Sequence, residues 1–128
     1  MPAALDTTEP ALCVVRLSGE VTLEETLAVV NALVPHVRPG VDILVDGTAV
    51  VRPLKVWELG VLANDLRKLR SRGLQRVAVA SPKLLVREIA RVFGSFVSVI
   101  EIKLKVFHTL EEAQAWLRPA KGENPAAK

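Results

Sequence analysis

Two histidines and one cysteine are the side chains best suited to metal or nucleophilic chemistry in this chain of 128 residues. His36 follows the first expected helix and His108 precedes the last, so we expect the two rings at opposite ends of their elements. Neither histidine has a cysteine nearby or a second histidine at ligand spacing, so no metal site is predicted. Cys13 lies inside the apolar segment ALCVVRL, which is typical of a small buried hydrophobe. The sequence therefore predicts no metal, no cofactor and no catalytic residue.

A second polar set follows the expected strands and consists of Asp46, Thr48, Arg52, Ser81 and Lys83. In open α/β sheets, ligands bind outside the carboxyl ends of the strands, and helix N-termini there favour anions. The same residue types also cap loops and helices in ordinary βα units, and we prefer that interpretation. No general acid–base pair stands out, so an enzyme that uses Asp46 and Ser81 is only the third hypothesis.

The elements that position these residues alternate between strand and helix. Strands are predicted at 11–17, 41–46, 74–80 and 99–107, and helices at 23–34, from about 53 to 72, at 83–93 and at 110–117. Part of residues 1–10 is a candidate for an additional strand. This alternation predicts an α/β fold with a single four- to five-stranded, mostly parallel sheet and four helices.

Composition supports one globular domain, since half of the residues are hydrophobic and 24% are charged. We expect the domain to span residues 1–118 and residues 119–128, which are rich in Pro, Gly and Lys, to form a disordered tail. No apolar run approaches the ~20 residues that span a bilayer, so stable membrane insertion is not expected. The N-terminus lacks the features of a signal peptide, which favours a cytoplasmic location.

The second helix carries the sharpest functional signal. At 100° per residue, Leu54, Trp57 and Val61 fall opposite the stripe expected to face the core. A contiguous exposed apolar patch marks a contact surface, and Trp is frequent at binding hot spots. The alternative is that the preceding loop or an N-terminal strand covers Trp57. We weigh the two equally, because helix phase is uncertain near an end.

A cluster of basic residues ends this helix and continues beyond it: Arg67, Lys68, Arg70, Arg72 and Arg76. Such a cluster could contact phosphates. Acidic residues on the same helix dilute the charge, and no aromatic residues are interleaved for base stacking. We therefore interpret the cluster as a solvated helix end and expect no nucleic-acid partner.

Three segments resemble the STAS-type domains of bacterial anti-sigma-factor antagonists, and in particular the SpoIIAA-like group of small stand-alone proteins. They are LSGEVT at 17–22, ILVDGTAV at 43–50 and LGVLANDLRKLRSRG at 59–73. Antagonists of the phosphorylated kind carry Asp-Ser-Ser-Gly before the matching LGVL, where this chain has Lys55, Val56, Trp57 and Glu58. The resemblance therefore implies the fold and a partner-docking corner, but the phosphoacceptor position is Trp57, which a kinase cannot phosphorylate.

Two functions follow as the main hypotheses. The first is a non-enzymatic STAS-like, SpoIIAA-like regulatory domain that contacts a protein partner, such as a regulatory kinase or a second copy of itself, through Leu54, Trp57 and Val61. The second is a domain that binds a small molecule or lipid in a pocket between the second and third helices, at the carboxyl edge of the sheet above Asp46.

Overall fold

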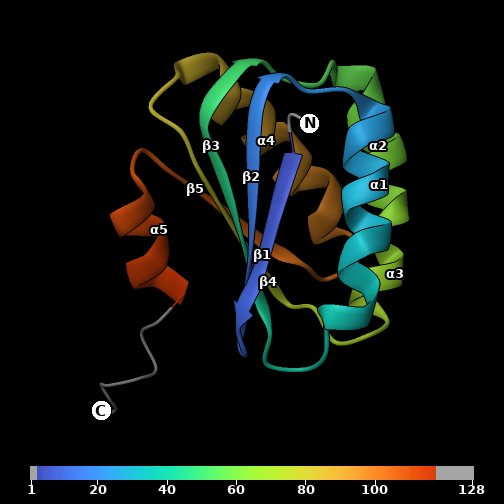
Figure 1. Ribbon diagram of the computed structural model, residues 1–128. Helices are drawn as coiled ribbons and strands as arrows, with labels where there is room; N and C mark the ends of the chain where they lie inside the picture. The colour runs from blue at the N-terminus through green and yellow to red at the C-terminus, as the bar shows by residue number, and fades with distance from the viewer. Residues whose placement is uncertain (1–2, 118–128) are drawn as a thin grey trace.

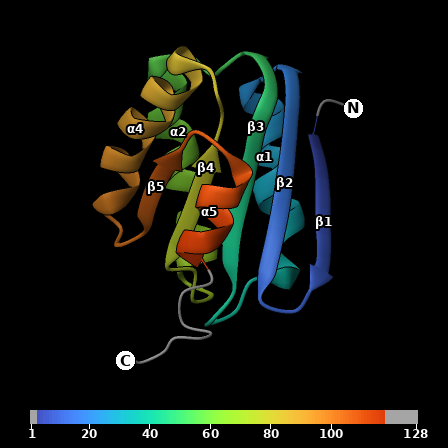
Figure 2. The ribbon, with the colours of Figure 1, turned by 90° about the vertical axis from the view of Figure 1, so that its left-hand side faces the viewer.

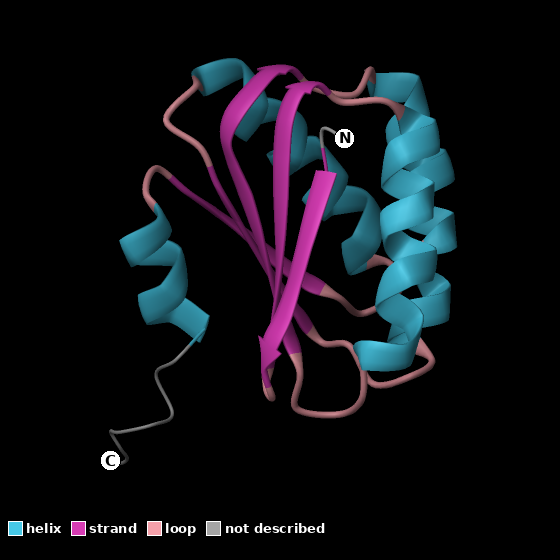
Figure 3. Ribbon diagram, in the orientation of Figure 1, coloured by secondary structure: helices cyan, strands magenta, loops and turns pink. Residues whose placement is uncertain are grey.

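The computed structural model describes residues 3–117, which form one sheet with helices on both of its faces (Figures 1 and 3). The strands are β1 (Ala3–Glu9), β2 (Leu12–Glu20), β3 (Asp42–Arg52), β4 (Arg76–Ala80) and β5 (Lys103–Phe107). The helices are α1 (Leu23–Leu33), α2 (Val56–Asp65), α3 (Arg67–Arg70), α4 (Leu84–Ser98) and α5 (Leu110–Leu117), with a 3-10 turn, η1 (Val34–His36), after α1. The tail expected at 119–128 lies outside the described residues.

The strands occur in the sheet in the order in which they occur in the chain, β1-β2-β3-β4-β5. β1 runs antiparallel to β2, and the other three pairings are parallel. The predicted fold class, a mostly parallel α/β sheet, is confirmed, and the candidate N-terminal strand is present as β1. β5 lies at an edge of the sheet, as the alternation of its side chains indicates.

All three crossover connections advance in the same direction along the sheet. Because a right-handed crossover fixes the face on which its helix lies, α1, α2 and α4 all cover one face. α2 packs between α1 and α4, so it occupies the middle of this helical layer. α5 alone covers the other face, where it packs mainly on β4, while β1 and β2 stand clear of it (Figure 2). The outward side of α2 is thus the centre of the helical surface.

The main core lies between the sheet and the three-helix layer and is almost entirely aliphatic. Leu69 and Leu74 are fully buried there, on either side of Gly73. A smaller core between the sheet and α5 contains Leu44 and Ala113. Because β3 and β4 contribute side chains to both cores, they have the near-continuous apolar sequences that a doubly covered strand requires.

Several predicted boundaries are wrong, and each has a local cause. The long second helix is interrupted at Leu66, whose N–H reaches the carbonyls of both Leu62 and Ala63. The third helix does not stop at Gly94, because α4 continues to Ser98. Gly94 is instead a close-packing position: an added Cβ would lie 3.4 Å from Leu104 Cδ2. Ser81 does not cap α4 either, since Lys83 is its N-cap residue.

Candidate functional site

The N-terminal turn of α2 is fixed by reciprocal hydrogen bonds and presents Trp57 to solvent. The N–H of Lys55 donates to Glu58 Oε1 at 2.8 Å, and the N–H of Glu58 donates to the carbonyl of Lys55 at 2.9 Å. Trp57 is 67% exposed and Val61, on the next turn, is 46% exposed. The interpretation that β1 or the β3–α2 loop covers Trp57 is therefore wrong. The predicted patch retains two of its three members.

Leu54 is the exception, because it is only 7% exposed and points into the interior. The prediction placed Leu54 by continuing the helical phase backwards from Trp57. α2 begins at Val56, so Leu54 belongs to the preceding loop, to which a helical phase does not apply. Pro53, which was expected in the first turn of the helix, precedes it for the same reason.

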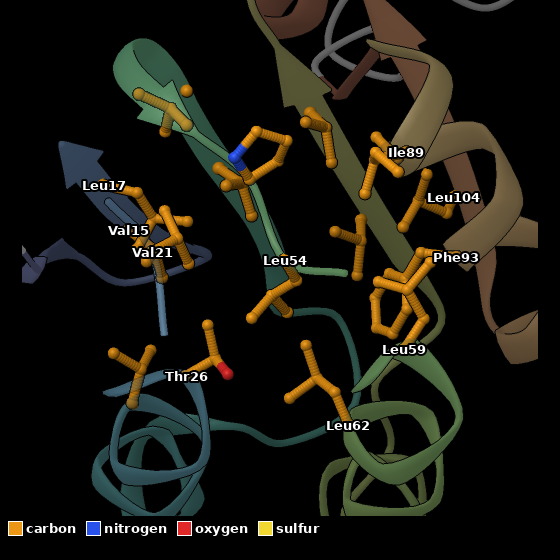
Figure 4. A pocket seen from close by; sticks show the side chains of 18 of the residues that line it. Val15, Leu17, Val21, Thr26, Leu54, Leu59, Leu62, Ile89, Phe93 and Leu104 are labelled. Carbon is orange, nitrogen blue, oxygen red and sulfur yellow. The ribbon is translucent and has the colours of Figure 1, made fainter. Parts of the chain in front are cut away.

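Leu54 contributes to an apolar cavity of about 160 Å³ between the sheet and helices α1, α2 and α4 (Figure 4). The wall is aliphatic apart from Phe93, and Thr26 is its one lining residue with a polar side-chain atom. The Thr26 hydroxyl donates to main-chain carbonyls of α1, at 2.8 Å to Leu23 and 3.2 Å to Thr22. The cavity therefore presents almost only hydrocarbon, and the proton of its one lining hydroxyl is already donated within α1.

None of the five polar residues expected at the carboxyl edge lines this cavity. Asp46 Oδ1 accepts from the N–H of Thr48 at 3.0 Å and from its hydroxyl at 2.6 Å. Ser81 is fully buried, and its Oγ accepts from the N–H of Lys83 at 3.2 Å. Asp46 therefore forms the local loop contacts that we preferred, whereas Ser81 bonds within the β4–α4 loop without capping the helix, and the role of these residues in ligand binding stays a prediction.

The other two polar residues also have local partners. Lys83 Nζ donates to the carbonyl of Val50, which joins the β4–α4 loop to the end of β3. Arg52 lies 3.9 Å from Glu20, and both side chains are largely exposed. The five polar residues therefore make separate contacts in their loops and do not converge on one cavity.

Cys13 is buried in β2, and this burial raises the pKa of its thiol above the ordinary value, against a smaller opposing effect of Arg38. A raised pKa leaves less thiolate at neutral pH, so the sulfur is a poor nucleophile. Within residues 3–117, no three His, Cys, Asp or Glu side chains are grouped so that they could hold a metal ion.

The sequence hypothesis placed a pocket between the second and third helices, above Asp46; the cavity is lined by α2 and α4 but also by α1, and Asp46 is not part of its lining. Sequence reasoning missed a row of exposed apolar residues on α4, including Leu85, Val92 and Phe96. Their spacing of seven and four residues was available as a signal. The signal was overlooked because a second row on the same helix, Val86, Phe93 and Val97, was sufficient to predict a helix that packs on the core.

The family model described as SpoIIAA-like matches residues 12–118, which is well over half of the chain. The chain belongs to the SpoIIAA-like family. The resemblance inferred from the three sequence segments is thereby confirmed. No curated protein matches the chain.

Solved structures with the SpoIIAA-like fold resemble this one over nearly their whole length. The anti-sigma factor antagonist SpoIIAA in its unphosphorylated form has a TM-score of 0.61 and 19% identity, over 94% of this chain and 99% of that one. An uncharacterised protein from Shewanella loihica PV-4 has a TM-score of 0.60 and 19% identity, over 90% and 91% of the two chains. The Bacillus cell fate determinant SpoIIAA in its phosphorylated form has a TM-score of 0.55 and 18% identity, over 91% and 99%.

The family match and these structures assign the chain the SpoIIAA-like, STAS-type fold. Within the described residues, no helix has both the length and the apolar character to cross a membrane.

Proposed function

We propose that this protein is a non-enzymatic, cytoplasmic regulatory domain that contacts a protein partner and lacks the phosphoacceptor of the phosphorylated antagonists. The observation that carries the proposal is the exposed indole of Trp57 at the start of α2. In the match to the antagonist motif, this residue takes the place of the phosphorylated serine. An indole has no hydroxyl to accept a phosphoryl group, so recognition here would depend on apolar contact.

Energetics support a contact role for Trp57. A large apolar side chain left in water forgoes roughly 1.5–3 kcal/mol of burial free energy, which a partner that covers it would recover. Trp is among the residues that most often dominate an interface. Val61 extends the same surface by one helical turn. The thiol of Cys13 and the hydroxyl of Ser81 are both buried, which supports binding over catalysis.

The test is a comparison of partners captured by the wild-type chain and by Trp57→Ala, immobilised at equal density and quantified by mass spectrometry. Arg16→Ala is the matched control, because Arg16 is exposed on the opposite face of the sheet. We expect a partner, such as a regulatory kinase or a second copy of the chain, to be retained by the control and lost by Trp57→Ala. Folded Trp57→Ala that keeps every partner would contradict the proposal.

The apolar cavity favours a second candidate function, the binding of a small apolar molecule. A hydrocarbon-lined void of about 160 Å³ is comparable to an engineered cavity of about 150 Å³ that stays dry and binds benzene. A lipid chain or another ligand without polar groups at that depth fits these walls. Native mass spectrometry of freshly purified protein tests this. We expect an added mass that Ala90→Leu, which fills the cavity, removes; a clean mass for the wild-type chain would count against it.

A further inference from the structure

The exposed apolar surface of this protein is concentrated on two neighbouring helices. Among the described residues, most large hydrophobic side chains with substantial exposure belong to α2 or α4, while Val51 lies on β3 and Val99 is the C-cap residue of α4. The full set is Val51, Val56, Trp57, Val61, Leu84, Leu85, Val92, Phe96 and Val99. None lies on α1 or α5 in that part of the chain. A one-sided apolar surface of this kind marks an interaction site and not random surface composition.

A groove runs between α2 and α4 inside this surface. Gly60, Ala63 and Asn64 line it from α2 and Arg67 from α3, while Phe96 of α4 and the adjacent Val99 and Ile100 line the other side. An added Cβ at Gly60 would meet no atom within 4 Å, so the space above this glycine is open. The small residues let an incoming element approach the backbone of α2 closely, between two apolar walls.

The groove residues, together with exposed apolar residues that continue their rows along α2 and α4, have a spacing that fits a third helix. Val56, Gly60, Ala63 and Arg67 recur at steps of four, three and four along α2 and α3. Leu85, Val92, Phe96 and Val99 recur at steps of seven, four and three along α4 and just beyond it. Alternating steps of three and four are the pattern by which helices pack lengthwise against each other. An amphipathic helix in an apolar groove is also a common mode of peptide recognition.

The charged residues around the groove indicate which charge its occupant should carry. Nearby basic residues have carboxylate partners, since Lys68 pairs with Asp65, Arg70 with Glu101 and Arg91 with Glu88. Arg67 forms no ion pair with any carboxylate in residues 3–117, and its Nε donates to the neutral side chain of Asn64 at 3.0 Å. An acidic side chain on the occupant would complement this cation.

A second copy of the chain is a poorer fit. If α4 of that copy were the occupant, its two arginines and one glutamate would add positive charge beside Arg67. We propose that the α2–α4 groove binds an amphipathic helix of a partner protein, whose apolar stripe fills the groove and whose acidic residue pairs with Arg67. This proposal rests on the proposed protein-contact function and specifies its partner.

The test begins with a displayed library of random peptides of about 16 residues, enough for four helical turns, selected on the purified full chain. We expect the enriched peptides to share apolar residues at helical spacing and at least one Asp or Glu. The strongest is then synthesised with a fluorophore, and its affinity is measured by anisotropy against the wild-type chain and its variants.

Gly60→Leu is the most informative variant, because leucine is a better helix former than glycine and its side chain would occupy the groove. We expect it to weaken peptide binding at least about tenfold without lowering the melting temperature. Arg67→Glu should weaken binding of the acidic peptide. A peptide with lysine in place of the acidic residue should recover affinity for that variant. Arg16→Glu, a charge reversal on the opposite sheet face, should change nothing.

The contradicting outcomes are distinct. If no peptide is enriched, if the enriched peptides bind Gly60→Leu as well as wild type, or if the charge swap fails to restore affinity, the groove proposal is overturned. Self-association of the wild-type chain that Gly60→Leu abolishes would assign the groove to a second copy instead. Loss of a cellular partner with Trp57→Ala, but with neither groove variant, would leave the proposed function standing and remove this inference alone.

Discussion

Arg76 and Asp42 form a two-point ion pair, with 2.6 Å between Nη2 and Oδ2 and 3.2 Å between Nε and Oδ1. The same guanidinium donates to the carbonyls of Trp116 and Leu117, at 3.3 and 2.9 Å, and lies 5.4 Å from the centre of the Trp116 ring. One side chain of β4 therefore joins β3 to the end of α5. This contact holds the helix that covers the second face of the sheet.

Replacing Arg76 with Met should destabilise the fold by roughly 1–3 kcal/mol, because the carboxylate of Asp42 and the last carbonyls of α5 lose their donor. Urea unfolding gives the free energy, and hydrogen–deuterium exchange should show faster exchange in α5. Arg91→Met is the matched control, since its pair with Glu88 is solvent-exposed and worth about 0–1 kcal/mol. Equal losses for the two variants would refute the role of Arg76.

Two helix ends predict opposite effects of glycine. Just beyond the end of α4, Glu101 has φ +67°, and the N–H of Ile102 donates to the carbonyl of Val97 at 3.1 Å. The segment ending in α3 stops in the same way at Gly73, with φ +109°. Glycine is favoured at this position after a helix, because it adopts a positive φ without a steric cost. Glu101→Gly should therefore stabilise the protein by about 1 kcal/mol, the cost of the left-handed backbone.

The reverse substitution, Gly73→Ala, should destabilise it, because the new Cβ would lie 2.6 Å from the nitrogen of Pro39. Thermal unfolding of both variants measures the contrast. Ser98→Gly, at a helical position of α4, is the control and should lower stability. A stability loss for Glu101→Gly would show that its exposed contact with Arg70 outweighs the backbone strain.

The core and the proposed contact surface should respond differently to truncation. Leu69 is completely buried, so Leu69→Ala should cost about 2–5 kcal/mol through lost burial and the cavity left behind. Val61→Ala should stay within about 0.5 kcal/mol, as expected for an exposed site. Chemical denaturation of the two variants checks this. A large loss at Val61 would mean that the residue supports the fold.

The thiol of Cys13 should react slowly with iodoacetamide while the protein is folded, because burial raises its pKa and limits access. The pKa of this thiol is higher in the folded than in the unfolded protein, so the neutral thiol contributes its full stability to the fold at pH values below the unfolded-state pKa. That contribution is lost as pH rises through the folded-state pKa. Mass spectrometry after timed alkylation, with and without denaturant, measures the rate. Rapid labelling of folded protein at neutral pH would contradict the buried position.

The fold could be predicted because the signals that specify it are local. Thr22 and Glu25 form a capping box at the start of α1, with 3.2 Å from the N–H of Glu25 to Thr22 Oγ1. Gly73 ends its helical segment as expected, and the strands have the apolar sequences of covered strands. Gly94 gave the same local signal as Gly73 but lies inside α4, beside Leu104. Sequence alone does not distinguish a glycine that ends a helix through its backbone angle from one within a helix.

The candidate site was predictable only in part. Val61 lies inside α2, where helical phase is reliable, whereas Trp57 is the second residue of the helix, so phase left its exposure open and the structure decides it. Leu54 lies two residues before the helix, where phase has no meaning. The cavity and the α2–α4 groove depend on how three helices pack on the sheet, which no single segment encodes.

The exposure of the Trp57 indole is the fact on which both proposals depend, and acrylamide quenching of its fluorescence measures it directly. In Trp116→Phe the emission comes from Trp57 alone, and Trp57→Phe gives the matched signal of Trp116, which packs against Phe107. We predict quenching of Trp57 close to that of N-acetyltryptophanamide in water, and much weaker quenching of Trp116. Weak quenching of Trp57 in the folded protein would mean that the indole is covered, and would contradict the account.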